Sequence, residues 1–280
     1  MASCRNISYA VAVVPHADGT SFISGYKQAL GNRVAFIDAV DGRNQTATIA
    51  ALLESGIKFG DTSRGGRSWG KLATFLTKLR LLKRQLDDKL PWQVILEDDV
   101  ILYQPAFEDY VSTSCRRMQS DSRIDLSQLS KYAEILLTSL QGARKIVSKI
   151  EELGMLKNDD HQLLDSKVMG TVVHTDRSCA MRCYGPKKYA NSTRPFTIGR
   201  LTNHGDIAAA QKLTWAEVAL LRILTRSPRA AEPLFGLLPG AEVGQDPYWR
   251  ERKAKKAATR KRRSEAATLR RHSTGEVVKS

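Results

Sequence analysis

The chain has 280 residues, of which 42% are hydrophobic and 26% charged, a composition typical of a globular protein and unlike that of a disordered or fibrous one. No apolar stretch approaches the roughly 20 residues that a membrane-spanning helix needs, and residues 10–14 are too short for the apolar core of a signal peptide. We therefore expect a cytoplasmic protein without a transmembrane segment, unless the sequence is a fragment of a secretory-pathway protein.

The net charge of +15 is unevenly distributed. Residues 250–280 hold twelve Lys or Arg against three Glu, so this segment carries +9 of the total. We expect one folded domain over residues 1–235 and a basic extension over 236–280, disordered or helical. The segment 250–280 could contact nucleic acid or an anionic membrane, or it could be a plain solvated extension. Its lack of interleaved aromatic residues gives no support to stacking on bases.

The four cysteines do not form a recognisable disulfide framework. Cys179 and Cys183 lie close together in the sequence, but a structural zinc site needs a second ligand pair at a suitable spacing. Idle or buried thiols are the favoured interpretation for all four.

The first part of the chain alternates between strand and helix. Residues 8–14 predict a buried strand, followed by a loop at 15–19 that would face a ligand in a doubly wound fold. Residues 20–30 predict an amphipathic helix that ends at Gly31-Asn32, and residues 33–37 predict a second strand. This order is typical of a parallel sheet with crossover helices.

A long amphipathic helix is predicted next. A helix at 46–55 and a Gly- and Arg-rich loop at 60–67 precede it, and it runs from about Ser68 to Leu90, before Pro91. Leucines at helical spacing form its apolar stripe. The residues predicted to face solvent on this helix are Lys71, Lys78, Arg80, Arg84 and Asp87.

The stretch Trp92–Val100 joins an apolar run to three consecutive carboxylates, Glu97, Asp98 and Asp99. The apolar run predicts a strand buried on both faces. Unpaired charges inside such a sheet would be costly, so the acids should lie at the carboxyl end of the strand, where open α/β sheets bind their ligands. Carboxylates suit Mg²⁺ or Mn²⁺. The alternative is a solvated acidic turn.

The remaining elements are predicted with less regular patterns. Residues 105–129 predict a polar, irregular excursion. After it we expect a strand at 132–138, a helix from Ser139 to about Leu153 that Gly154 ends, a polar segment at 158–162, a strand at 168–174 and a helix at 206–225 with a capping box at Thr214–Glu217.

Four segments resemble those of glycosyltransferase family 25, which includes lipopolysaccharide-core and collagen galactosyltransferases with the GT-A fold. They are the first strand with Val40-Asp41-Gly42, Gly70 with the helix it opens, Val94–Val100, and Leu137–Ala143 leading to Asn158–Leu163. Together they span about residues 8–166. The resemblance implies an α/β fold with a GT-A-like, Rossmann-type mixed sheet flanked by helices. One departure is that this chain has Thr74-Phe75 where family members often have Ser-His.

The resemblance also implies roles for the acidic motif. Asp99 would bind Mn²⁺ or Mg²⁺. Glu97 and Asp98 would contact the ribose, the donor sugar or metal-bound water, with Glu97 as a second metal ligand. Alternation along a strand places Glu97 and Asp99 on the same face, which agrees with that assignment.

Further residues follow from the same resemblance. Asp160, or else Asp159, would be the general base that deprotonates the acceptor. His204 would be a late metal ligand. The remaining residues expected to bind the nucleotide sugar are Val14, Asp41, Arg64 and Arg67.

The sequence therefore predicts a metal-dependent, inverting glycosyltransferase that moves a hexose, with galactose favoured, from a UDP-sugar to a glycan or protein hydroxyl. A nucleotidyltransferase is a weaker alternative, because residues 15–19 make a poor phosphate loop. The other alternative is a degenerate transferase domain that acts as a binding module through its basic tail.

Overall fold

The computed structural model describes residues 4, 6–13, 20–60, 68–98, 100–102, 105–130, 133–157, 159–175, 198–200 and 213–226. The contacts divide the chain into two units, Met1–Pro228 and Arg229–Ser280, and every described residue lies in the first. The predicted basic extension at 236–280 lies outside the described residues, and its boundary with the folded domain stays a prediction.

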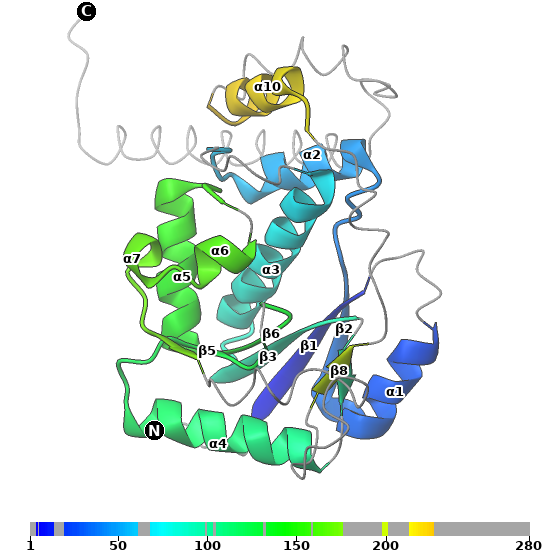
Figure 1. Cartoon of the computed structure of the whole chain (residues 1–280), viewed down its shortest axis with the longest axis vertical. Helices are drawn as coiled ribbons and strands as arrows, with labels where there is room; N and C mark the ends of the chain where they lie inside the picture. Colours follow the sequence, from blue (N-terminus) through cyan, green and yellow to red (C-terminus); the bar gives the residue numbers. More distant parts are fainter. Residues whose placement is uncertain are drawn as a thin grey trace, which may run out of the picture. The chain divides into compact units, whose positions relative to one another are not determined.

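The core of the first unit is a six-stranded mixed sheet (Figure 1). In spatial order its strands are β2 (Val34–Asp38), β1 (Ile7–Val13), β3 (Trp92–Glu97), β6 (Ile135–Ser139), β5 (Leu126–Gln128) and β7 (Val173–Thr175). Strand β1 is parallel to β2 and β3, β6 is antiparallel to β3 and β5, and β7 is parallel to β5. The predicted α/β class with a mixed sheet is confirmed.

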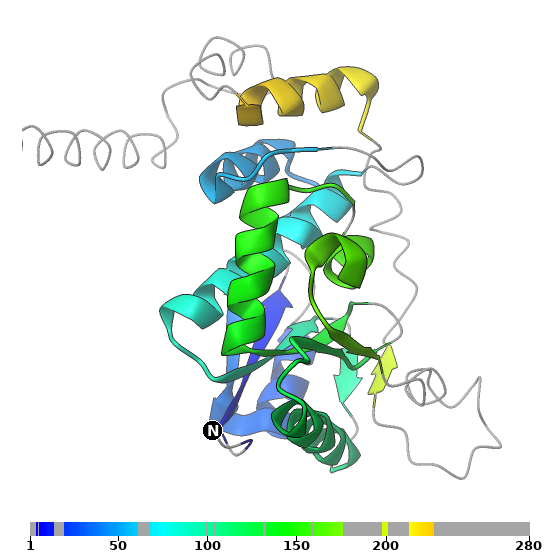
Figure 2. The same cartoon turned by 90° about the vertical axis from the view of Figure 1, so that its left-hand side faces the viewer.

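Helices α1 (Thr20–Leu30) and α4 (Ala106–Ser120) cover one face of this sheet, and α3 (Trp69–Asp87) and α5 (Leu140–Leu153) cover the other (Figures 1 and 2). The other described helices are α2 (Gln45–Ser55), α6 (Asp159–Leu163), α7 (Ser166–Met169) and α10 (Trp215–Arg226), with a short 3₁₀ turn η1 (Gly31–Arg33) after α1. A separate two-stranded sheet pairs β4 (Val100–Leu102) with β8 (Ile198–Arg200). None of the described helices has the length and apolar character needed to cross a membrane.

Alternation along the strands separates two layers of side chains. Val94 and Leu96 of β3 pack in one cluster with α1 and α4, through residues such as Tyr26 and Phe107. Gln93 precedes Val94 and points to the opposite face of the sheet, where its Nε2 donates to the Leu81 carbonyl of α3 at 3.3 Å. Strand β3 is therefore buried on both faces, as its continuous apolar run predicts.

Buried polar contacts fix α3 to the sheet. The Thr138 hydroxyl of β6 donates to Gln85 Oε1 at 2.6 Å, and Gln85 Nε2 lies 3.2 Å from the Thr138 carbonyl. Both side chains are fully buried, so leaving either one unsatisfied would cost about 1–3 kcal/mol. These bonds set where α3 lies along the sheet, which matters because α3 carries several residues of the site described below.

Local signals predicted several elements well. Helix α1 has the predicted bounds, and α5 begins after Ser139, whose Oγ accepts from the Gly142 N–H at 2.9 Å. The capping box is also present, since the Thr214 N–H donates to Glu217 Oε2 at 2.7 Å and the Glu217 N–H to Thr214 Oγ1 at 3.2 Å.

Two predicted segments differ from the structure. Residues 105–129 are not irregular, because they contain α4 and β5; the side chains of α4 that recur at helical spacing and are buried are Phe107, Tyr110, Val111, Ser114, Cys115 and Met118. The predicted strand at 168–174 instead holds α7, a turn at Gly170 with a left-handed backbone, and only the short strand β7.

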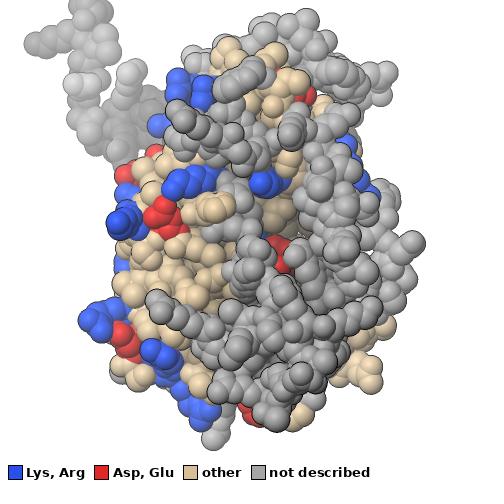
Figure 3. Space-filling model, in the orientation of Figure 1, with Lys and Arg blue, Asp and Glu red and all other residues tan. Residues whose placement is uncertain are grey.

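The surface of the described part carries mixed charge. Figure 3 shows basic and acidic side chains next to one another along one edge of the face it displays. Ion pairs such as Lys83–Glu151 and Lys149–Glu152, both 2.9 Å, contribute to this mixture. Interspersed charges of both signs are typical of an ordinary solvated surface.

Cys4 and Cys115 form a disulfide that joins the segment before β1 to α4, with a Cα–Cα distance of 6.0 Å. The interpretation of these two cysteines as idle thiols is therefore wrong. The bond spans 111 residues of sequence, so no spacing pattern could reveal it. Disulfides are typical of proteins that fold in oxidising compartments, in contrast to the cytoplasmic expectation. Cys179 and Cys183 lie outside the described residues.

Reducing this disulfide should lower the stability of the fold. Disulfides typically contribute about 2–4 kcal/mol to stability, so we expect the Tm of the intact chain to fall by roughly 5–15 °C in reductant. Thermal unfolding followed by circular dichroism, with and without dithiothreitol, measures this. The matched control is Cys4→Ala with Cys115→Ala, whose Tm should not respond to reductant. A thiol titration should first show that the reductant has opened the disulfide in the intact chain. If the Tm is then unchanged, the prediction is contradicted.

Candidate active site

The carboxyl ends of three parallel strands meet at one edge of the sheet. Val13, the last residue of β1, pairs with Asp38, the last of β2, and Ala12 pairs with Glu97, the last of β3. Open α/β sheets bind their ligands at this edge. Glu97 ends β3 and Asp98 lies in the turn that follows, so both occupy the position that the sequence predicts.

Glu97 forms an ion pair with a buried lysine. Lys78 Nζ lies 2.8 Å from Glu97 Oε1, and the side chains of Lys78 and Glu97 are 2% and 24% exposed. The prediction that Lys78 faces solvent is wrong, because α3 contacts the sheet as well as α2, α5 and α6 and so is covered around most of its circumference. A buried ammonium group is thus paired with Glu97, the first carboxylate of the acidic motif.

The turn that carries the acidic motif is held from α1. The hydroxyl of Tyr26 lies 2.8 Å from the Glu97 carbonyl oxygen and 2.7 Å from that of Val100. Tyr26 is almost fully buried. One side chain therefore holds both Glu97, the last residue of β3, and Val100, the first residue of β4.

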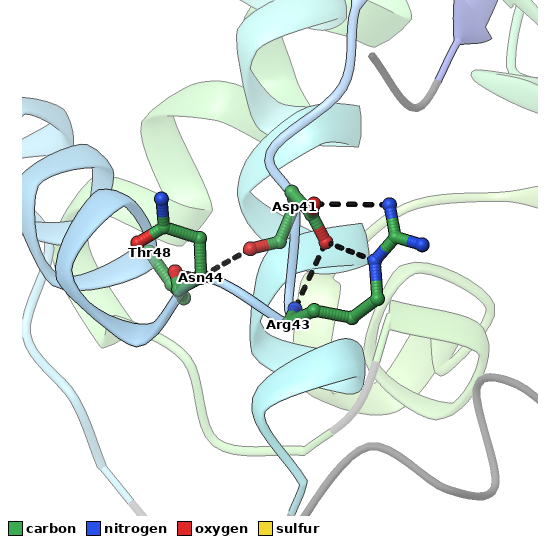
Figure 4. Close-up of polar contacts among 4 residues, drawn as sticks. All are labelled: Asp41, Arg43, Asn44 and Thr48. Atoms are coloured by element: carbon green, nitrogen blue, oxygen red, sulfur yellow. Dashed lines mark hydrogen bonds and ion pairs between the residues drawn. The ribbon is translucent and has the colours of Figure 1, made fainter. Parts of the chain in front are cut away.

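The loop after β2 is built around Asp41 (Figure 4). Asp41 Oδ1 accepts from the backbone N–H and Nε of Arg43, both at 2.9 Å, and Oδ2 accepts from the guanidinium at 3.0 Å. Its carbonyl accepts from the Asn44 N–H at 3.0 Å and the Thr48 hydroxyl at 3.1 Å. The side chain of Asp41 is 17% exposed and that of Arg43 53%. Asp41 thus holds the half-exposed guanidinium of Arg43, a residue for which the sequence predicts no role.

Helix α3 holds this loop as well as the acidic motif. The Val40 N–H donates to Thr77 Oγ1 at 2.9 Å, and Thr77 precedes Lys78. A Cβ on Gly42 would lie 2.5 Å from the Cα of Gly70, so the loop can pack on the first turn of α3 only through glycine. Adjacent residues of one helix therefore fix the loops that follow β2 and β3.

Thr74 and Phe75 serve the helix and the core. The Thr74 hydroxyl donates to the Gly70 carbonyl at 3.0 Å, and Phe75 is fully buried. These are the positions at which members of the resembled family often have Ser-His. Neither side chain offers an imidazole, so that part of the family pattern has no counterpart here.

The second acidic segment forms α6, which contacts α3. Gln162 fixes its position, because its Oε1 accepts from the Leu156 N–H at 2.7 Å and its Nε2 donates to the Gly154 carbonyl at 2.8 Å. Asp159 and Asp160 form the first turn of α6, and their side chains lie outside the described residues.

Asp165, which follows α6, has a structural role. Its carboxylate caps α7 by accepting from the Val168 N–H at 3.2 Å and pairs with Lys157 Nζ at 2.7 Å. The hydrogen bond from Lys157 holds the pKa of the Asp165 carboxyl below its usual range. A carboxylate that is ionised and doubly engaged in this way is a poor proton acceptor, so Asp165 does not replace Asp160 as the candidate base.

Several predicted site residues lie outside the described part of the chain. They are Val14, Arg64, Arg67, Asp99 and His204. Within the described part, no three His, Cys, Asp or Glu side chains lie close enough to hold a metal. The chemistry of the acidic turn nevertheless suits a hard divalent cation, because Mg²⁺-type sites commonly use one or two carboxylates together with the phosphates of a substrate.

No family model matches this chain, and no curated protein is similar to it in sequence. The solved structures that are similar to it at low identity include three glycosyltransferases. One, involved in glycosylation of the major capsid of PBCV-1, is 8% identical, with a TM-score of 0.39, over 70% of this chain and 94% of its own. At such values the likeness says nothing about the reaction of this chain.

The other two similar structures are a galactosyltransferase and a xylosyltransferase. The galactosyltransferase LgtC, solved with donor and acceptor sugar analogs, is 14% identical, with a TM-score of 0.35, over 79% of this chain and 84% of its own. Mouse xyloside xylosyltransferase 1 is 8% identical, with a TM-score of 0.35, over 72% of this chain and 85% of its own.

Proposed function

We propose that this chain is a metal-dependent, inverting glycosyltransferase that moves a hexose, galactose favoured, from a UDP-sugar to a hydroxyl of a glycan or protein. The observation that carries the proposal is the placement of Glu97 and Asp98 at the carboxyl edge of three parallel strands, beside the Asp41 loop. The order of motifs that resembles glycosyltransferase family 25 supports the same reaction class.

In this proposal, the loops at this edge of the sheet bind the donor. Asp99 would hold Mn²⁺ or Mg²⁺, with Glu97 and His204 as further ligands. When bound, the cation neutralises the charge that develops on the leaving diphosphate. Glu97, Asp98, Val14 and the Asp41 loop are proposed to contact the nucleoside and the sugar.

Cationic side chains would bind the diphosphate. Arg64 and Arg67 are the proposed contacts, and the half-exposed guanidinium of Arg43 is a further candidate beside the same edge. A guanidinium can donate two parallel hydrogen bonds to phosphate oxygens. Arg43 has the advantage that its pairing with Asp41 restricts its conformations before the ligand arrives.

Transfer requires a base on the acceptor side. In the proposed step, an acceptor oxygen attacks C1 of the sugar, its proton passes to the carboxylate of Asp160 (or Asp159), and the C1–O bond to UDP breaks with the electron pair leaving on the diphosphate. Attack opposite to the leaving group inverts the configuration at C1. A general base of this kind contributes about 10²–10⁴-fold to the rate.

Calorimetry on the intact chain tests the proposal. We expect a panel of UDP-sugars to bind only with Mn²⁺ or Mg²⁺ present, because the diphosphate and the carboxylates repel one another without a cation. Slow release of free sugar from one member of the panel, followed by chromatography, should identify the donor. Chelation by EDTA should abolish both signals. If no UDP-sugar binds with either metal, the transferase proposal fails.

A further inference from the structure

Asn44 begins a glycosylation sequon at the surface of the fold. The sequence there is Asn44-Gln45-Thr46, which fits the Asn-x-Ser/Thr pattern that accepts N-linked glycans. Further sequons begin at Asn6 and Asn191. The pattern alone is weak evidence, because it also occurs in proteins that never meet the modifying enzyme. Two structural observations support it here, namely a disulfide elsewhere in the fold and the contacts of the Asn44 amide.

The Cys4–Cys115 bond bears on the compartment in which the chain folds. Its Cα–Cα distance of 6.0 Å lies within the range of ordinary disulfides. Cys115 is fully buried, and Cys4 packs against the same hydrophobic cluster. Disulfides form and persist in oxidising compartments such as the lumen of the endoplasmic reticulum. N-linked glycans are attached in that same lumen, so a chain that acquires this bond there also meets the modifying enzyme.

The Asn44 side chain has one polar atom bonded to the fold and one free for modification. Its Oδ1 accepts from the Ala47 N–H at 3.0 Å and so caps α2. No hydrogen bond joins Nδ2 to any residue in the described part of the chain, and Asn44 is exposed. Figure 4 shows Nδ2 directed away from Asp41 and Arg43. Because Nδ2 is the atom that carries the sugar, a glycan can be attached there while the helix cap stays in place.

Asn6 is a less suitable acceptor, although it is also exposed. The next residue, Ile7, is buried and is the first residue of β1. Cys4, two residues before Asn6, is held by the disulfide. A bulky glycan at Asn6 would stand between these two anchored positions, whereas Asn44 ends a loop at the surface. The third sequon, at Asn191, lies outside the described residues.

We propose that Asn44 is the site of an N-linked glycan. In this modification, Nδ2 forms a bond to C1 of the first sugar of an oligosaccharide that is carried by a lipid diphosphate. The C1–O bond to the diphosphate breaks with its electron pair leaving on that oxygen, and the amide gives up one proton to a base of the modifying enzyme. The carbonyl oxygen of the side chain is unchanged and still accepts from Ala47. The proposal does not depend on the transferase activity of this chain.

Mass spectrometry of the intact chain purified from its native cells tests the proposal. The protein is alkylated and digested without reduction, then treated with peptide N-glycosidase in heavy-oxygen water, which converts a glycosylated asparagine to labelled aspartate. We expect the label at Asn44, and a peptide pair in which Cys4 and Cys115 are still joined. Absence of the label at Asn44, with or without the disulfide, overturns the proposal. Label at Asn6 or Asn191 alone overturns it as well.

Variants of the sequon separate the glycan from the fold. Expressed in the same cells, Asn44→Asp should migrate as the unglycosylated chain, because a carboxylate does not accept the sugar but caps a helix as well as asparagine does. Thr46→Ala should also lose the glycan, whereas Thr46→Ser keeps the pattern and should keep the glycan. Gel mobility before and after treatment with peptide N-glycosidase measures these effects. If Asn44→Asp or Thr46→Ala shifts on treatment as much as the original chain does, the glycan lies elsewhere and the proposal fails.

Discussion

Gly142→Ala should destabilise the fold by about 3 kcal/mol or more, as overpacking of a rigid site does. A Cβ at residue 142 would lie far inside van der Waals contact with the carbonyl oxygen of Asp125. This oxygen belongs to the backbone, and several hydrogen bonds hold Asp125 in place. The Asp125 N–H donates to the Val172 carbonyl at 2.9 Å, and the Asp125 carboxylate accepts from the Val172 N–H at 3.0 Å and from Lys145 Nζ at 2.8 Å.

Helix α5 cannot move away to make room. In its first turn, the Gly142 N–H donates to the capping hydroxyl of Ser139. One turn further on, Lys145 forms an ion pair with Asp125. A shift of α5 would therefore break the cap, the ion pair or both. Relieving the clash therefore requires distorting the hydrogen bonds and the ion pair that join α5, β5 and the segment before β7.

Gly25→Ala is the matched control for this prediction. Gly25 lies inside α1, and an added Cβ would meet nothing within 4 Å. Alanine is favoured over glycine in a helix by about 1 kcal/mol, so this variant should be slightly more stable than the original. Urea unfolding followed by circular dichroism measures both changes. Equal stability of the two variants would contradict the packing described for Gly142.

The elements that the sequence predicts well are those with local signals. Ser139 and Gly154 bound α5 because capping depends on residues within one turn. Helix α4 was missed although its buried residues recur at helical spacing, because polar residues such as Asp109 and Gln119 interrupt its apolar character in sequence. The order of strands in the sheet depends on contacts between distant segments, such as the pairing of Ile7 with Trp92, and the Cys4–Cys115 bond spans 111 residues. Periodicity does not report contacts at such separations.

The site shows the same division. The position of Glu97 at a strand end follows from the cost of burying charge, and the pairing of Asp41 with Arg43 is a local turn that the sequence could have revealed. Lys78 and Tyr26 could not be found in this way. Both lie on helices and reach the acidic turn from 19 and 71 residues away along the chain, so only the packing of those helices on the sheet identifies them.

Replacing single aspartates should separate metal binding from proton transfer. Asp99→Asn should weaken Mn²⁺-dependent binding of the UDP-sugar by about a hundredfold, as loss of a metal ligand commonly does. Asp160→Asn should leave that binding within about threefold and lower the transfer rate by about 10²–10⁴-fold, because an amide cannot accept the acceptor's proton. Calorimetry with the donor and a single-turnover transfer assay measure the two effects separately.

The control for both aspartate variants is Asp121→Asn. Asp121 follows α4, and its hydrogen bond from Arg123 lowers the pKa of its carboxyl to about 2. It is therefore ionised at any assay pH near neutrality, so this variant removes one full negative charge, as Asp99→Asn does at neutral pH. Because Asp121 lies outside the proposed site, donor binding and transfer should stay as in the original chain. If Asp160→Asn loses donor binding as severely as Asp99→Asn, the division between a metal ligand and a base is wrong. If Asp121→Asn loses it too, the effects report overall charge and not a site at the end of β3.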